Sequence, residues 1–341
     1  MKNHFWSNLC KGGILTCSLL LGAPVSAQKA MEKGYETISE EQGKNYVEFL
    51  ADDLLEGRDA GMRGGQLAGK YIASLLRDWQ IPPYFSAGYA QSFDVAMLTK
   101  PQHGRWEVHP DSIAKINTTT AYRLRHLNNI IAAIPGKKLD EFIVIGAHYD
   151  HEGMEADILP DGIYNGADDN ASGVSAVLQI AKAFRQSGEL PERTVIFAFW
   201  DGEEKGLLGS RYFTAHWPHP EQIKGYMNFD MIGRGPVHKP DHLTYFYTAS
   251  HPAFGDWLQA DMKKYHFAFD PNYRPWENPV GGSDNGCFAK IGVPIVWYHT
   301  EGHPDYTRPT DHADKIDYKK MTDITRAAFL CAWRMANQKK F

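Results

Sequence analysis

The chain has 341 residues, of which 43% are hydrophobic and 23% are charged, and its formal net charge is −5. A chain of this length and composition can bury a full hydrophobic core, and no long segment has the composition of a disordered region. Charges of both signs are interspersed, without a basic run that would follow nucleic acid or hold an anionic membrane. The composition predicts a globular protein and argues against nucleic acid as a partner.

The first 27 residues have the pattern of an export signal. A basic start precedes an apolar run at residues 14–21 that is too short to span a bilayer, and residues 25–27 are small amino acids before a cleavage position. We expect residues 1–27 to be a signal peptide and residues 28–341 to form one domain. The expected location is periplasmic or extracellular, without stable membrane insertion after signal removal. A membrane anchor is the alternative, and the oligomeric state is not predicted.

Removal of the signal leaves two of the four cysteines, Cys287 and Cys331. Both lie in partly apolar sequence, and they do not have the spacing of metal ligands. The sequence predicts two buried thiols. A disulfide between them is the alternative in an oxidising compartment.

Apolar residues recur at helical spacing from residue 40 to residue 79, with a glycine-rich interruption at 57–65. This pattern predicts two helices joined by a loop. The following stretch, 84–120, is aromatic and irregular, which suggests one or two strands at the edge of a sheet.

Downstream of residue 127, short runs rich in Ile and Val alternate with helical patterns. Residues 171–186 have an apolar stripe at helical spacing, with Asp169 or Asn170 able to cap the start of the helix and Gly188 near its end. This order predicts an α/β fold with a mostly parallel central sheet flanked by helices. The expected strands, buried on both faces, are residues 129–134, 142–147, 194–200, 227–229 and 291–298.

Polar residues follow the ends of three of these strands. His148 comes directly after 142–147, Glu203 and Glu204 come shortly after 194–200, and Asp230 follows 227–229. Parallel strands bring their carboxyl ends to one edge of a sheet, where ligands bind. We expect these side chains to meet there, together with Asp169 from the start of the helix.

The types of side chain in this set favour a metal centre. Neutral histidine with carboxylates and no nearby cysteine suits Zn2+, with manganese or cobalt as weaker options. Asp169, Glu204 and Asp230 would repel one another strongly if they were buried without cations. The adjacent glutamates can divide the work, with Glu204 binding metal and Glu203 transferring the proton of a metal-activated water to a leaving amine. This chemistry is peptide-bond hydrolysis.

The same segments resemble the co-catalytic dizinc exopeptidases of the bacterial leucyl aminopeptidase type, whose relatives include glutamate carboxypeptidase and glutaminyl cyclase. The resemblance covers most of the chain after residue 27 and implies the zinc-exopeptidase (phosphorylase/hydrolase-like) architecture. It also implies peptide substrates that lose their amino-terminal residues. The motifs that carry it are 145–151 (IGAHYDH), 165–173 (NGADDNASG), 200–204 (WDGEE) and 228–233 (NFDMIG).

The resemblance also implies a role for each site residue. Two zinc ions are expected to share the carboxylate of Asp169, although one ion is possible. Asp150 is expected to orient His148, and Glu203 is the general base. His148 and Asp230 then complete one zinc site, and Glu204 belongs to the other.

The sequence departs from this family at the last zinc ligand. The family has a histidine four residues before an aspartate in the loop after the final strand, and that register falls on Thr307, ahead of Asp311. We expect a neighbouring histidine to substitute, with His303 as the first candidate and His299 and His312 as the others. The alternative is that the second zinc is weakly bound or missing.

The departure at Thr307 leaves two other functions open. A glutaminyl cyclase is a one-zinc acyltransferase of the same fold, and a catalytically inactive relative would only bind peptides. The setting of Asp169 in GADDN, together with DGEE at 201–204, is closer to the peptidases. The leading hypothesis is a metallo-aminopeptidase that acts after export.

Overall fold

The computed structural model describes residues 25–98, 106–118, 122–155, 157, 160–277 and 281–341. Most of the expected signal peptide therefore lies outside the described residues, as do two of the four cysteines. Among the residues that are described, no helix combines the length and the apolar character that crossing a bilayer requires.

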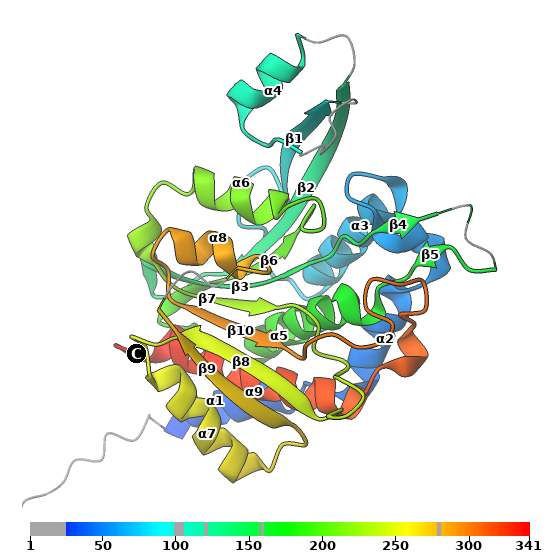
Figure 1. The fold of residues 1–341 in the computed structure, drawn as a ribbon. Coiled ribbons are helices and arrows are strands. Elements are labelled where there is room, and N and C mark those ends of the chain that lie inside the picture. Colours follow the sequence, from blue (N-terminus) through cyan, green and yellow to red (C-terminus); the bar gives the residue numbers. More distant parts are fainter. Residues whose placement is uncertain (1–24, 99–105, 119–121, 156, 158–159, 278–280) are drawn as a thin grey trace, which may run out of the picture.

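One sheet of eight strands forms the centre of the described structure (Figure 1). Its strands are β1 (Ala90–Leu98), β2 (Tyr122–Ile134), β3 (Lys138–His148), β6 (Arg193–Trp200), β7 (Ile223–Phe229), β8 (His242–Thr248), β9 (Asp270–Trp276) and β10 (Ile295–His299). The strand order is β1-β2-β6-β3-β7-β10-β8-β9. The pairs β6/β3, β3/β7, β7/β10 and β8/β9 are parallel, whereas β1/β2, β2/β6 and β10/β8 are antiparallel. The prediction of a mostly parallel central sheet is confirmed.

All five expected strands are present, as β2, β3, β6, β7 and β10, with shifted ends. Strand β2 begins at Tyr122 because it continues as a ribbon with the edge strand β1, and β10 begins only at Ile295. Strands β8 and β9 were not predicted. A short hairpin of β4 (Gly153–Met154) and β5 (Ile163–Tyr164) lies outside the main sheet.

Helices cover both faces of the sheet. The larger core contains buried side chains from α2, α3, α5 and α9, and the smaller core, on the other face, contains side chains from α6 and α8 (Figure 1). The helices are α1 (Val25–Tyr35), α2 (Glu40–Leu50), α3 (Arg63–Asp78), α4 (Pro110–Ile116), α5 (Gly173–Ser187), α6 (Leu208–His216), α7 (Ala253–Tyr265), α8 (Asn285–Lys290) and α9 (Tyr318–Asn337). The predicted pair of helices in 40–79 is confirmed as α2 and α3.

Helix α5 begins directly after the segment that carries Asp169. Residues Ala167–Ser172 form a π-helical turn, and the side-chain oxygen of Asn170 accepts the N–H of Gly173 at 3.2 Å. The helix ends at Gly188, whose φ of 79° is in the left-handed region that favours glycine. The predicted end at Gly188 is confirmed. The helix begins at Gly173, two residues after the predicted start, because the segment that carries Asp169 continues as the π-helical turn up to Ser172, which occupies the N-cap position.

The prediction of two buried thiols is also confirmed. Cys287 belongs to the smaller core and Cys331 to the larger one, so the sheet separates them, and both are free.

Candidate metal centre

The predicted site residues converge at the carboxyl ends of three neighbouring strands. His148 is the last residue of β3, Glu203 follows β6, and Asp230 follows β7 directly. Strand β3 pairs in parallel with both β6 and β7, so these three ends lie side by side. Asp169 joins them from the turn before α5. The convergence predicted from the sequence is therefore present in the fold.

A first group of possible ligands consists of His148, Asp169 and Asp230, all of which are buried. His148 Nε2 lies 3.4 Å from Asp169 Oδ1 and 3.7 Å from Asp230 Oδ1. Tetrahedral zinc with bonds of about 2.0–2.1 Å holds its ligand atoms roughly 3.3 Å apart. The spacing of this group fits one zinc ion.

A second group consists of His151, Asp169 and Glu204. His151 Nδ1 lies 2.7 Å from Glu204 Oε1 and 4.0 Å from Asp169 Oδ2. Asp169 thus belongs to both groups, with one carboxylate oxygen directed to each histidine. In the sequence His151 stands only as the last residue of the motif at 145–151, without a predicted role. Its position three residues after His148, in the same segment after β3, is the sequence feature that could have indicated a second ligand.

Glu203 belongs to a third group, with His148 and Glu204. Its backbone N–H donates to Asp150 Oδ1 at 3.0 Å, and the N–H of Glu204 donates to Asp150 Oδ2 at 3.3 Å. Asp150 approaches His148 most closely through its backbone carbonyl, 3.2 Å from Nδ1, whereas its carboxylate lies 3.8 Å away. The carboxylate of Asp150 therefore holds the loop that carries the two glutamates.

Electrostatics at this cluster favour bound cations. Burial, together with the charge of Glu204, raises the pKa of Asp169. Burial also raises the pKa of Glu204 to about 8 and that of Glu203 well above its usual range. Without a counter-charge Glu204 would hold a proton at neutral pH, and divalent cations favour the ionised form. Burial lowers the pKa of His151 to about 4, which keeps the imidazole in the neutral form that binds metal. The residues fit zinc.

The histidines expected to replace the missing ligand have other neighbours. His303 is buried with Nε2 3.2 Å from Asp168 Oδ2. His299 Nδ1 lies 2.6 Å from the carbonyl oxygen of Asp230, and His312 Nε2 lies 3.2 Å from Asp161. None of the three belongs to a group of ligand atoms in the described part of the chain. The ligand role expected of His303 therefore stays a prediction, and the groups of ligand atoms contain His151 instead.

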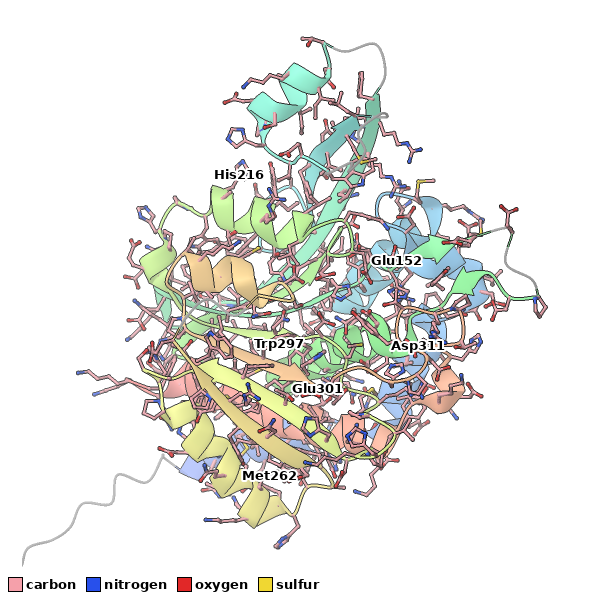
Figure 2. All side chains as sticks on the ribbon, viewed as in Figure 1. Glu152, His216, Met262, Trp297, Glu301 and Asp311 are labelled. Atoms are coloured by element: carbon pink, nitrogen blue, oxygen red, sulfur yellow. The ribbon has the colours of Figure 1, made fainter. Side chains whose placement is uncertain are left out.

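Asp311, labelled in Figure 2, holds the backbone of the shared carboxylate residue. Its Oδ2 accepts the N–H groups of Asp168 at 2.9 Å and Asp169 at 3.2 Å. Asp168 is fully buried and accepts the N–H of Gly233 at 2.6 Å, so it acts as a hydrogen-bond acceptor within the fold.

Arg58 ties together the two loops that carry ligands. Its buried guanidinium donates to the carbonyl oxygens of Tyr149 at 2.9 Å, Asn165 at 2.6 Å and Gly166 at 2.9 Å. A further bond reaches the carbonyl of Leu50 in α2 at 2.5 Å. No sequence pattern identifies Arg58 as part of the site, because its carbonyl partners become neighbours only in the folded chain.

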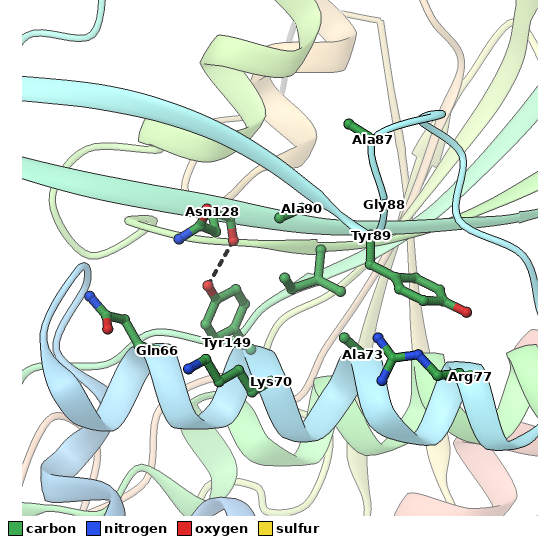
Figure 3. Close-up of a pocket in the computed structure, with 12 residues that line it drawn as sticks. Gln66, Lys70, Ala73, Arg77, Ala87, Gly88, Tyr89, Ala90, Asn128 and Tyr149 are labelled. Atoms are coloured by element: carbon green, nitrogen blue, oxygen red, sulfur yellow. Dashed lines mark hydrogen bonds between the residues drawn. The ribbon is translucent and has the colours of Figure 1, made fainter.

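A separate cavity of about 570 Å³ lies between α3 and the strands β1 and β2 (Figure 3). Lys70 and Arg77 line it from α3, and Tyr149 lines it with a hydroxyl that donates to the carbonyl oxygen of Asn128 at 2.7 Å. No residue that lines this cavity belongs to the three ligand groups. The cavity is therefore distinct from the metal centre.

Comparison with known proteins gives a family match over the region that carries these groups. The model of peptidase family M28 matches residues 129–332. Leupeptin-inactivating enzyme 1 of Streptomyces exfoliatus is 30% identical over 189 residues, which cover 55% of this chain and 38% of that protein. A probable leucine aminopeptidase of Arthroderma otae is 27% identical over 236 residues, which cover 66% of this chain and 63% of that protein. The chain thus spans less than two thirds of the length of either relative.

Solved structures share the fold at low sequence identity. An aminopeptidase from Aneurinibacillus sp. strain AM-1 has a TM-score of 0.64 and 15% identity, with 92% of this chain and 97% of that chain covered. A glutaminyl cyclase from Porphyromonas gingivalis has a TM-score of 0.59 and 16% identity, with 86% and 98% covered. The α/β architecture is therefore common to enzymes with different reactions, and function depends on the site.

Replacing Arg58 should destabilise the fold around the metal centre. We expect Arg58→Ala to lower the free energy of unfolding by about 3 kcal/mol or more, because several buried carbonyls lose a charged donor. Urea unfolding followed by circular dichroism measures this change. The control is Arg63→Ala, which removes an exposed ion pair with Glu56 and should cost less than about 1 kcal/mol. Equal unfolding midpoints for the two variants would contradict the assigned role.

Proposed function

Because this chain belongs to peptidase family M28, we propose that it is a zinc-dependent aminopeptidase that hydrolyses amino-terminal residues from peptides. The observation that carries the proposal is the position of Asp169, whose Oδ1 faces His148 at 3.4 Å and whose Oδ2 faces His151 at 4.0 Å. A carboxylate between two ligand groups fits two zinc ions close together, as in other two-metal hydrolases. The leucine aminopeptidase among the curated relatives supports amino-terminal residues as the substrate.

Glu203 is the proposed general base of this reaction. Bound zinc supplies a Lewis acid that polarises the scissile carbonyl and makes water more acidic. Glu203 has a carboxylate oxygen within 4.8 Å of the ligand atoms of His148 and Glu204, and the carboxylate of Asp150 fixes its backbone. From this position it takes the proton from the attacking water and passes it to the leaving amine.

Tyr306 is the proposed donor to the substrate carbonyl. Burial, with the nearby negative charges of Asp169 and Asp230, raises the pKa of its phenol to about 12. The phenol therefore keeps its proton at neutral pH, and its side chain is 46% exposed and accessible to a peptide. A donor beside the metal centre can stabilise the negative charge that develops on the carbonyl oxygen.

The proposed setting is outside the cytoplasm, in the periplasm or the surrounding medium. The support for it is the signal-like pattern of the first 27 residues. The substrates proposed there are peptides with free amino termini.

Zinc removal is the first test of the proposed activity. We expect the purified protein to release p-nitroaniline from aminoacyl p-nitroanilides, to lose this activity in 1,10-phenanthroline, and to regain it with Zn2+, because the reaction depends on the metal. A parallel assay follows conversion of an amino-terminal glutamine peptide to pyroglutamate. Cyclisation without hydrolysis would favour the glutaminyl cyclase, which the threonine at position 307 leaves as the second candidate. The absence of both reactions would favour an inactive peptide-binding relative.

The second test concerns Glu203. We expect Glu203→Gln to retain zinc and to lower kcat by about 10²- to 10⁴-fold, because the amide cannot accept the proton. Metal analysis and steady-state kinetics on the same preparation separate these effects. Glu189→Gln, at an exposed position, serves as the matched control and should leave kcat unchanged. Normal turnover by Glu203→Gln would reject the general-base role.

The third test concerns Tyr306. We expect Tyr306→Phe to lower kcat by about 10²-fold with little change in KM, because the lost hydrogen bond strengthens in the transition state. Tyr122→Phe, at another exposed tyrosine, is the control and should leave kcat and KM unchanged. A Tyr306→Phe enzyme with unchanged kcat would exclude the phenol as a donor.

A further inference from the structure

The second group of ligands contains a histidine from an unexpected segment. The resemblance to the zinc exopeptidases implies a histidine at position 307, where this chain has threonine. We propose that His151 supplies the missing nitrogen and binds the second zinc ion through Nδ1, together with Asp169 and Glu204. This inference rests on the proposed function, because it assigns a ligand within the same metal centre.

The geometry of the second group supports this assignment. His151 Nδ1 lies 2.7 Å from Glu204 Oε1 and 4.0 Å from Asp169 Oδ2. The mean of these two separations is close to the spacing of roughly 3.3 Å between ligand atoms around tetrahedral zinc. A shift of the ring by less than about 1 Å would equalise them, which is within the adjustment that a ligand makes on binding.

The imidazole of His151 is fixed against the turn that carries the shared carboxylate. A Cβ atom at Gly166 would lie 2.6 Å from His151 Cδ2, so only glycine allows the ring to pack this closely. The backbone N–H of His151 donates to the carbonyl of Arg58 at 3.2 Å. Nε2 is buried and has no hydrogen-bond partner among the described residues. The polar contacts of the ring are therefore made through Nδ1, which faces the carboxylates.

The assignment gives the two zinc sites equal ligand sets. Each ion receives one histidine nitrogen and one carboxylate of its own, from His148 and Asp230 or from His151 and Glu204. Asp169 completes both sites. Three carboxylates then balance most of the charge of two divalent ions, which favours binding of both in a buried cluster.

Zinc binding by the full chain, without substrate, tests this assignment. The wild-type protein should bind two Zn2+ per chain by mass spectrometry and by titration in chelator-buffered zinc. His151→Gln should bind one ion tightly and the other at least about 100-fold more weakly, because it loses a direct ligand. His303→Gln is the matched control for a buried histidine next to a carboxylate, and it should retain both ions. Circular dichroism and thermal unfolding show whether each variant is folded.

The outcomes separate the two proposals. A wild-type protein without zinc would refute the proposed function. If His151→Gln binds two ions with the same affinity as the wild type, only the role of His151 is overturned. A wild-type protein that binds a single ion would overturn the same assignment. Diffraction from wild-type crystals at the zinc absorption edge provides a test that needs no variant. An ion about 2.0–2.1 Å from His151 Nδ1 supports the assignment, and an ion more than about 3 Å from it overturns it.

Discussion

Mutual repulsion between buried carboxylates is the constraint on which the rest of this site depends. Glu204 and Asp230 are drawn together because the ends of β6 and β7 both lie beside β3, and Asp169 joins them from the turn before α5. Burial makes their ionised forms costly, and cations or protons must offset that cost. In the proposed two-zinc centre, the histidines on either side of Asp169 would let cations offset that cost at two points.

The backbone of the site is held by groups that do not depend on metal. Asp150 and Asp311 accept N–H groups from the residues that carry the carboxylates, and Arg58 donates to the carbonyls of both ligand loops. Each of these charged side chains is buried and satisfies main-chain groups in the segments that carry the ligands. The ligands are thus positioned in advance, so that little reorganisation accompanies metal binding.

The local pattern of apolar and polar residues in the sequence was sufficient to predict part of this architecture. The strands that end at His148 and Asp230, and the helix after Asp169, have periodicities and caps that are visible in the sequence. Strands β8 and β9 were missed because they are polar and aromatic, and β8 is placed mainly by antiparallel pairing with β10. His151, Arg58 and the surroundings of His303 depend on contacts between distant segments. Such contacts follow from the tertiary structure, and the only local signal among them is the position of His151 three residues after His148.

The separation of Cys287 and Cys331 by the sheet has a consequence for folding. Burial raises the pKa of the first thiol to about 11 and that of the second to about 12, so neither forms an appreciable amount of thiolate near neutral pH. Thiolate is the species that attacks disulfides, and these groups are both shielded and too far apart to react together. These two thiols therefore need neither an oxidant nor a disulfide isomerase to reach the buried, reduced state that the structure shows.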